Sequence, residues 1–313
     1  MAEPTITSPT YAGEFAGKYI SAALLSAPSI DGGAVTVMPN IKYKEVLQNL
    51  DTSALLANAD CDFQTDGATV TLTEKVLSVK DLQLNLQLCK SQFHSNWQAT
   101  EMGFSAFDNL PKSFEDYLLA YAASKIAQEV EISLWRGATG TAGQFDGLVT
   151  LATADADVND VTAVVGGVDA SNVIDELGKI IDSVNSNTNI YGKEDCKIFV
   201  SRNIMAAYVR ALGGFASNIG ANGVNNEGTM WYAKGQAISF DGVPLFLAEG
   251  LAADTAMAAC TSNLFFGCSL LSDTQEARVI DVSQYDGSDN VRVIMRMAAG
   301  AQIGVGGDVV LYS

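Results

Sequence analysis

The residue types that carry most enzyme chemistry are scarce or wrongly spaced in this 313-residue chain. His94 is the only histidine, which excludes a histidine-based catalytic triad and any metal site with several histidines. Glu129 and Glu131 stand two residues apart, so they cannot share one helix face as a catalytic pair. No G-x-S-x-G, P-loop or G-x-G-x-x-G motif follows a predicted strand. The sequence therefore predicts no catalytic residue, no cofactor site and no enzyme.

One acidic segment resembles a calcium-binding loop at first. Its oxygen-bearing side chains are Asp155, Asp157, Asn159 and Asp160. A calcium loop of the EF-hand type requires glycine at its sixth position and glutamate at its twelfth. Asp160 occupies the first of these positions and Gly166 the second. We therefore predict a solvated acidic loop and no metal site.

Charge and cysteine content restrict the partners and the compartment. The net charge is −18, and no run of lysine or arginine occurs. Tight wrapping of nucleic acid needs clustered cations, so only weak, non-specific contact with it stays open. The five cysteines show no C-x-x-C spacing, and we interpret them as reduced core residues of a protein made in a cytoplasm. Because Glu3 and Glu14 precede the weakly apolar N-terminal stretch, we expect no secretory signal.

The overall composition suggests that little of the surface faces water. Hydrophobic residues make up 48% of the chain and charged residues only 17%, against a usual charged fraction of about 25%. This balance suits a protein whose flanks are covered by neighbouring chains. A large compact enzyme would show the same balance, so both readings stay open at this point.

A long helix with two apolar faces is predicted over residues 111–137, with Ser113 as N-cap and Gly137 as its stop. The first apolar stripe contains Phe114, Tyr117, Leu118, Tyr121, Ile132 and Trp135. The second, nearly opposite, contains Leu119, Ala123, Ile126, Val130 and Leu134. Such a helix needs cover on two sides, from its own domain or from another chain. Its charged residues exclude a membrane span.

The segments before this helix are predicted to form an arm and a long hairpin. Residues 1–50 are predicted to have little core of their own, with Pro28, the Asp31-Gly32-Gly33 turn and Pro39 breaking any regular element. Over residues 68–97 leucines alternate strictly with polar residues, which predicts a two-stranded hairpin turning somewhere within residues 74–81. An isolated hairpin is marginal in water, so it should rest on a partner surface.

The segments after the helix predict a compact α/β block and closing strands. Residues 145–148 are expected to turn into a strand, and Ser171 to cap a helix over 172–184. A strand at 197–200, a helix at 202–212, a hairpin turning on Asp241-Gly242 and a strand at 263–267 follow. At the C-terminus, Gly300 marks a bend, and Gly306-Gly307 is expected to pair residues 302–305 with 308–312.

The order of these parts resembles the major capsid proteins of tailed bacteriophages, which share the Hong Kong 97-like fold. The local carriers of the resemblance are Trp135-Arg136-Gly137, Phe145-Asp146-Gly147-Leu148, residues 196–212, Asp241-Gly242-Val243-Pro244-Leu245, residues 263–267 and residues 290–312. The resemblance covers almost the whole chain. It implies an α+β fold with an N-terminal arm (1–67), an extended hairpin loop (68–97), a peripheral domain (98–170 and 268–313) holding a spine helix (113–136), and an axial domain (171–267).

The resemblance also implies a function. The chain would be a coat protein that assembles with itself, as hexamers and pentamers, into an icosahedral shell around phage DNA, in a virion built in the host cytoplasm. Portal and decoration proteins would be its other partners, and no membrane would be involved. The extended-loop tip, expected to contact a neighbouring subunit, would comprise Lys75, Val76, Leu77, Ser78, Val79, Lys80 and Asp81. We expect no covalent cross-link through Lys75 or Lys80. An encapsulin-like compartment shell, or a soluble α/β enzyme, is the alternative.

Overall fold

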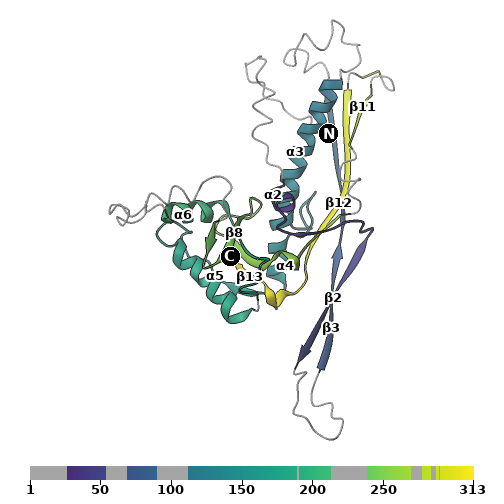
Figure 1. Ribbon diagram of the computed structural model, residues 1–313. Coiled ribbons are helices and arrows are strands. Elements are labelled where there is room, and N and C mark those ends of the chain that lie inside the picture. Colours follow the sequence, from purple (N-terminus) through teal and green to yellow (C-terminus); the bar gives the residue numbers. More distant parts are fainter. Residues whose placement is uncertain are drawn as a thin grey trace. The chain divides into compact units, whose positions relative to one another are not determined.

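The computed structural model describes residues 27–53, 69–89, 112–188, 190–212, 238–268, 277–282, 287–288 and 290–313 (Figure 1). The chain divides into two compact units. Unit 1 comprises residues 1–26, 83–128 and 275–296, and unit 2 comprises residues 27–82, 129–274 and 297–313. The first 26 residues of the predicted arm and His94 lie outside the described residues.

An α/β block forms one part of unit 2. Its six-stranded sheet has the order β5-β13-β9-β6-β8-β7. In that order the strands are Asn159–Val161, Val310–Tyr312, Ala256–Cys260, Cys196–Val200, Val243–Leu247 and Ser239–Phe240. Strand β6 runs parallel to β8 and antiparallel to β9. The sheet extends beyond the range 171–267 predicted for the axial domain, because β5 and β13 complete it.

Two amphipathic helices pack on this sheet. Helix α5 (Val173–Asn187) and helix α6 (Arg202–Leu212) confirm the predicted helices. The buried residues of α5 share one face at i, i+3 and i+4 spacings, and they are Val173, Glu176, Leu177, Ile180, Ile181 and Val184. The cap differs from the prediction. Asn172, not Ser171, stands at the N-cap, because the Ser171 hydroxyl donates to the Asp169 carboxylate at 2.5 Å.

The predicted turn between β7 and β8 is confirmed. Asp241 has a φ of 46° and Gly242 a φ of 79°, so both central residues adopt the left-handed region that a type I′ turn requires. Asparagine, aspartate and glycine tolerate this region, which is why this dipeptide predicts a hairpin so well. Phe240 and Val243 are paired directly on either side of the turn.

A second sheet has the order β1-β10-β12-β11, with β4 also paired to β12. Its strands are β1 (Thr36–Met38), β10 (Leu264–Cys268), β12 (Asn290–Ile303), β11 (Ala277–Asp281) and β4 (Lys80–Cys89). In unit 2, β10 pairs with residues 299–303 of β12 and with β1. In unit 1, β11 pairs with residues 291–295 of β12. The predicted alternation of β4 is confirmed, since its leucines are half-buried and the polar residues between them exposed.

The long helix is α3 (Lys112–Arg136). It begins one residue before Ser113, so Ser113 lies inside the helix and is not its N-cap. In the part of α3 that belongs to unit 2, Val130 and Leu134 from one predicted stripe and Trp135 from the other are all buried. This confirms cover on both sides for that part. None of the described helices is long and apolar enough to cross a membrane.

Three local predictions are wrong. Residues 28–31 and 36–38, where prolines and glycines were expected to break any regular element, form helix α2 (Pro28–Asp31) and strand β1, since proline fits a first helical turn. Residues 148–154 form helix α4 (Leu148–Ala154) instead of a strand, because Leu148 and Ala152 are buried one turn apart. Strand β13 does not fold back on 302–305 but pairs with β5 and β9, beyond a short 3₁₀ turn at Gly306–Asp308.

The hairpin predicted over residues 68–97 does not fold on itself. Strand β3 (Thr69–Ser78) pairs antiparallel with β2 (Lys44–Ser53) over ten residues, whereas β4 pairs with β12. The alternation was visible in the sequence, but alternation does not specify the partner of a strand. Residues 44–53, which were predicted to belong to the arm, supply that partner.

Candidate assembly surface

The β2–β3 ribbon presents one face on which every large apolar side chain is exposed. Directly opposed residues of antiparallel strands share a face. The register opposes Val46 to Val76 and Leu50 to Leu72, with Val70 farther along the same face. The exposed fractions are 46% for Val46, 42% for Val76, 61% for Leu50, 56% for Leu72 and 60% for Val70. We call these five residues the apolar face.

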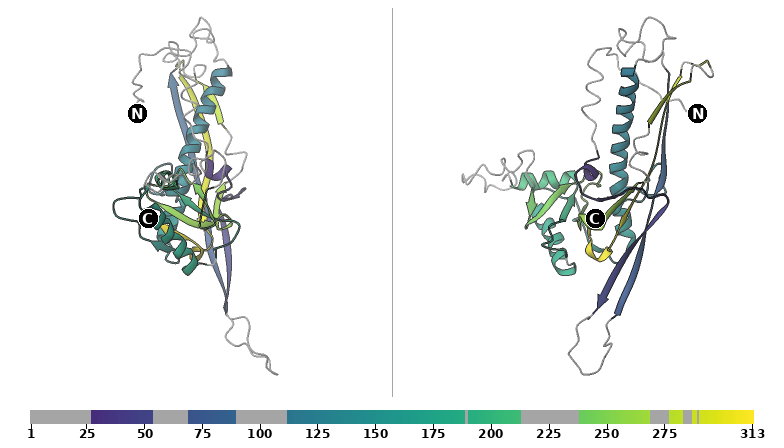
Figure 2. Two further views of the ribbon diagram at one scale, coloured as in Figure 1. Left: turned by 60° about the vertical axis from the view of Figure 1, so that its left-hand side comes forward. Right: turned by 45° about the vertical axis from the view of Figure 1, so that its right-hand side comes forward.

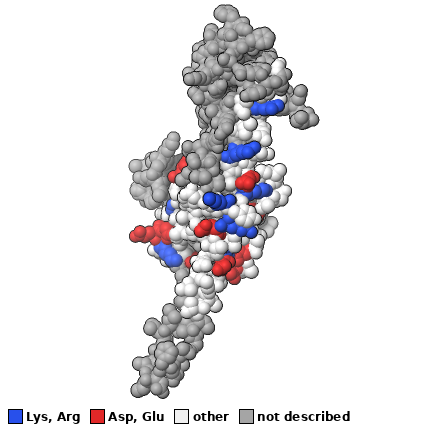
Figure 3. All heavy atoms as spheres, turned by 90° about the vertical axis from the view of Figure 1, so that its right-hand side faces the viewer, with Lys and Arg blue, Asp and Glu red and all other residues white. Residues whose placement is uncertain are grey.

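A ribbon of this kind is incomplete by itself. Two isolated strands are marginal in water, and full burial of one valine or leucine stabilises by about 1.5–3 kcal/mol. Figure 2 shows β2 and β3 extending away from the α/β block of the same unit. In Figure 3, the part of the ribbon farther from that block is white, without charged side chains on the visible face. The apolar face is therefore built to be covered by something outside the described residues.

The opposite face of the ribbon is anchored within unit 2. Leu77 is fully buried. Lys75, two residues earlier on the same face, forms an ion pair with Asp155 just after α4. Burial alone would raise the pKa of the Asp155 carboxyl, but hydrogen bonds from Lys75 and from the Asp157 N–H, with the charge of Lys75, lower it overall. The ion pair therefore fixes the base of the ribbon at neutral pH.

Further contacts hold the junction between β3 and β4. Lys80 Nζ donates to the carbonyl oxygens of Gln144 at 2.8 Å and Thr139 at 3.2 Å. The Gln302 amide donates to the carbonyl of Val76 at 2.9 Å. A Cβ at Gly300 would collide with the carbonyl oxygen of Ser78, so only glycine allows β12 to pass this closely. These contacts come from the loop after α3 and from the end of β12.

Residues 75–81, predicted as the tip of the extended loop, therefore do not form a turn at a tip. They join the base of the ribbon to the start of β4, and Leu77, Lys75 and Lys80 make their contacts within the chain. Their predicted contact with another subunit stays a prediction. The connection between β2 and β3, residues 54–68, lies outside the described residues.

A buried carboxylate ties α2 to α3. Ser29 Oγ donates to Glu131 Oε1 at 2.5 Å, and the Ser29 N–H donates to Glu131 Oε2 at 3.2 Å. Trp135 Nε1 lies 3.0 Å from Glu131 Oε1 and 2.8 Å from Ser29 Oγ. Burial raises the pKa of Glu131, the hydrogen bonds lower it and nearby Glu249 raises it further; the net direction is upward. The hydrogen bonds to Glu131 come from Ser29 of α2 and Trp135 of α3, so the Glu131 carboxyl attaches α2 to the long helix.

The described residues offer little for catalysis or metal binding. They contain no group of three or more histidine, cysteine, aspartate or glutamate residues able to hold a metal ion. Two residues of the predicted acidic loop at 155–160 make structural contacts within the chain. Asp155 pairs with Lys75, and Asn159 begins β5 and donates to the carbonyl of Gly307 at 3.2 Å.

Comparison with known proteins identifies the fold. No protein-family model and no curated protein sequence matches the chain. Among solved structures, the capsid of an empty GTA particle is similar with a TM-score of 0.63 and 14% identity, over 93% of this chain and 97% of that chain. A protein of Mycobacterium phage Adephagia is similar with a TM-score of 0.60 and 11% identity, over 97% and 94%. A capsid protein of cyanophage P-SCSP1u follows with a TM-score of 0.56 and 11% identity, over 98% and 92%.

The chain therefore has the mixed helix and strand fold of phage and GTA capsid proteins, across almost its full length and theirs. The apolar face, a surface made of two strands, was not predicted from the sequence. Its signal was present in part, because Val70 and Leu72 alternate with threonines in β3. The second half of the signal, in Val46 and Leu50, lay in a segment that proline and glycine spacing had assigned to the arm.

Proposed function

We propose that this protein is a major capsid protein, a coat subunit that assembles with copies of itself into an icosahedral shell enclosing phage DNA. The single observation that carries the proposal is the apolar face, exposed on a ribbon whose other face is anchored. The fold shared with capsid proteins supports it. The similar structures are phage and GTA particles, which favours a capsid over an enzyme-filled compartment.

The proposal assigns parts of the Hong Kong 97-like fold to elements of this chain. Helix α3 acts as the spine helix, and the block holding α5 and α6 acts as the axial domain. The ribbon β2–β3, in place of residues 68–97, acts as the extended loop. The strands of the second sheet act as the peripheral sheet. The role is structural, so the subunit needs no catalytic residue.

Assembly in trans follows from the energetics of the apolar face. A neighbouring subunit that covers most of these five side chains gains several times the 1.5–3 kcal/mol of one buried apolar residue. Repeated around a shell, such contacts compensate the translational and rotational freedom that each subunit loses. A second copy is the occupant that fits best, because a shell presents each subunit with an identical neighbour.

The other partners follow from the same role. Subunits group as hexamers and pentamers, and the shell also contacts a portal and decoration proteins. The net charge of −18 leaves only weak, non-specific contact with packaged DNA. Assembly takes place in the host cytoplasm, and the protein ends in the virion.

The test is expression of the protein followed by electron microscopy and light scattering. The unmodified chain is expected to form shells far larger than a small oligomer. The double variant Leu50→Ser and Leu72→Ser is expected to stay soluble and folded but to lose most particles, because polar groups then lie on the surface that must be buried.

A matched control is Ile174→Ser together with Val165→Ser. Both residues are exposed, 50% and 100%, but lie on the α/β block, away from the ribbon. The control is expected to assemble normally. Particles that form equally well from the ribbon variant would contradict the assigned surface. A monomer from the unmodified chain at all salt and protein concentrations would contradict the capsid function, and particles from infected cells that hold enzymes instead of DNA would favour the compartment.

A further inference from the structure

Two buried cysteines face each other across neighbouring strands of the α/β block. Cys196 begins β6 and Cys260 ends β9, and the register places them directly opposite. Both side chains turn toward the core that also holds Ile198 and Ala258. From the sequence, each cysteine was expected to be a separate, reduced core residue. The pairing appears only when the sheet is formed, because 63 residues separate the two positions in the chain, counted from 197 to 259.

The hydrogen bonds on either side define which kind of pair this is. The Thr261 N–H donates to the Asp195 carbonyl at 3.0 Å, and the Ser201 N–H donates to the Thr255 carbonyl at 3.2 Å. Hydrogen-bonded and non-hydrogen-bonded pairs alternate along an antiparallel ladder. The pair of Asp195 with Thr261 and the pair of Ser201 with Thr255 are both hydrogen-bonded, so the alternation makes Cys196 and Cys260 a non-hydrogen-bonded pair. Consistent with this, the Cys196 N–H donates to the carbonyl of Lys193.

This kind of pair suits a disulfide. Its Cα atoms lie about 4.5 Å apart, and its side chains are closer than in a hydrogen-bonded pair. Disulfides span Cα separations of about 4.4–6.8 Å. The register therefore already holds the two thiols on directly opposed residues of neighbouring strands, at the backbone spacing that a disulfide requires.

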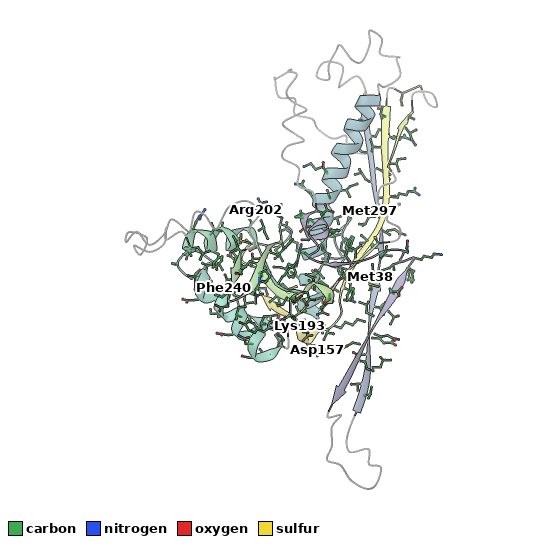
Figure 4. The ribbon with its side chains drawn as sticks, in the orientation of Figure 1. Met38, Asp157, Lys193, Arg202, Phe240 and Met297 are labelled. Carbon is green, nitrogen blue, oxygen red and sulfur yellow. The ribbon has the colours of Figure 1, made fainter. Side chains whose placement is uncertain are left out.

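The surroundings keep the pair reduced under mild conditions. Burial raises the pKa of Cys196 to about 11 and that of Cys260 to about 12, and the neighbouring Asp195 carboxylate adds to both. Lys193, labelled in Figure 4 on the turn before β6, acts in the opposite direction on both thiols. The reactive thiolate is therefore scarce at neutral pH. Because the pair lies at the ends of β6 and β9, with one further ladder hydrogen bond beyond it, opening of the strand ends gives a small oxidant access without unfolding of the block.

We propose that Cys196 and Cys260 are a modification site, a cross-strand dithiol that a hydroperoxide converts to a disulfide once the protein leaves a reducing compartment. One thiolate attacks the peroxide O–O bond, giving a sulfenic acid and water. The second thiol then attacks the sulfur of the sulfenic acid and displaces its hydroxide. The hydroxide takes the proton of that thiol and leaves as a second water. Two thiols and one hydrogen peroxide thus give one disulfide and two waters, with the sulfurs oxidised and the peroxide reduced.

The disulfide would strengthen the block without changing its fold. It joins two central strands and closes the long segment between them, which restricts the unfolded chain. The melting temperature of the oxidised protein is expected to rise by roughly 5–10 °C. This inference does not rest on the proposed function, because it concerns a single subunit whether or not shells form.

The test is peroxide treatment of the purified full chain at pH 8.5, followed by blocking of the remaining thiols in denaturant and mass spectrometry of non-reduced peptides. The expected result is a peptide pair linked through Cys196 and Cys260 that separates on reduction. The Cys260→Ala variant is expected to show neither this linkage nor the rise in melting temperature. The matched control Cys268→Ala, which removes another buried cysteine, is expected to show both.

The comparison of native with urea-unfolded wild-type protein keeps the test decisive if a variant fails to fold. The native protein should give this one linkage, whereas the unfolded protein should give a mixture among its five cysteines. Absence of the linkage in native protein, under conditions that oxidise an equivalent small thiol, would overturn the proposal. A linkage of Cys196 to any other cysteine would also overturn it.

Discussion

The α/β block and the β2–β3 ribbon belong to the same unit but differ in how their strands are covered. In the block, all five residues of β9 are buried, between β13 and β6. In the ribbon, each strand has one neighbour, and the five residues of the apolar face are exposed. The strands also differ in composition, since β9 is Ala-Met-Ala-Ala-Cys whereas β2 and β3 combine valine and leucine with polar residues. Both the number of neighbouring strands and the second, polar face of the ribbon therefore distinguish the two regions.

The two regions therefore obtain their stability from different contacts. The block gains it from burial within the subunit, so substitutions there should act on folding. Among the described residues, the contacts that hold the ribbon lie at its base, so substitutions on its apolar face should act on association. Four predictions test this division, and they are arranged from the largest expected effect on the free energy of unfolding to the smallest.

The largest effect is expected in the block. Phe199 is fully buried, with its ring centroid 5.0 Å from that of Trp135 and 5.7 Å from that of Phe246. Phe199→Ala should lower the free energy of unfolding by about 3–5 kcal/mol, because it opens a cavity between these rings. Urea denaturation measures the change. The control Phe199→Leu should cost clearly less than Phe199→Ala, because it leaves a smaller cavity. A Phe199→Ala protein as stable as wild type would contradict the claim that burial within the subunit stabilises the block.

An intermediate effect is expected at the base of the ribbon. Lys75→Met removes the cation beside Asp155, whose side chain is only 19% exposed, and should cost about 1–2 kcal/mol at pH 7. Because the folded pKa of Asp155 lies below its ordinary value of 3.8, the stabilisation is present above that value and is lost as pH falls through the folded pKa. The variant should therefore lose less stability than wild type on acidification. Equal acid profiles in urea denaturation would show that the ion pair does not hold the ribbon.

A smaller, pH-dependent effect is expected at Glu131. Its folded pKa is raised above 4.5, so the native state binds the proton more tightly than the unfolded state. Stability should therefore decline as pH rises from about that value through the folded pKa. Glu131→Gln keeps the shape and should remove this decline. Ser29→Ala, which removes the hydroxyl bonded to Glu131 and Trp135 but keeps the carboxyl, should retain it. Thermal melts from pH 4 to pH 8 measure how stability depends on pH in each variant. If the decline with pH is unchanged in Glu131→Gln, a group other than Glu131 causes it.

The smallest effect on folding is expected on the apolar face. In the unassembled subunit, Leu50→Ser with Leu72→Ser should change the free energy of unfolding by about 0.5 kcal/mol or less, because both side chains are already exposed. Leu77→Ala is the matched control on the other face of β3, and it should cost about 2–5 kcal/mol, since Leu77 is fully buried. Similar costs for both changes would mean that the ribbon is covered within its own chain.

Much of the fold could be predicted because the signals are local. The period of α5, the Asp241-Gly242 turn and the alternation of β4 each depend on residues within about four positions of one another, and the structure confirms all three. The capsid resemblance rested on the order of such elements along the chain. The failed predictions share the opposite property. A strand was expected after the turn at residues 145–148, but residues 148–154 form helix α4, in which Leu148 and Ala152 are buried one turn apart.

Local patterns of residues were enough to predict the type and order of most elements, and the need of α3 for cover on two sides. Only the tertiary structure decided which strands pair, and with that pairing came the apolar face, the Lys75 and Asp155 ion pair, and the meeting of Cys196 with Cys260. The physical reason is that strand pairing is made by backbone groups that every residue carries. Alternation marks a strand and its faces, while its partner is selected by packing between segments distant in the chain.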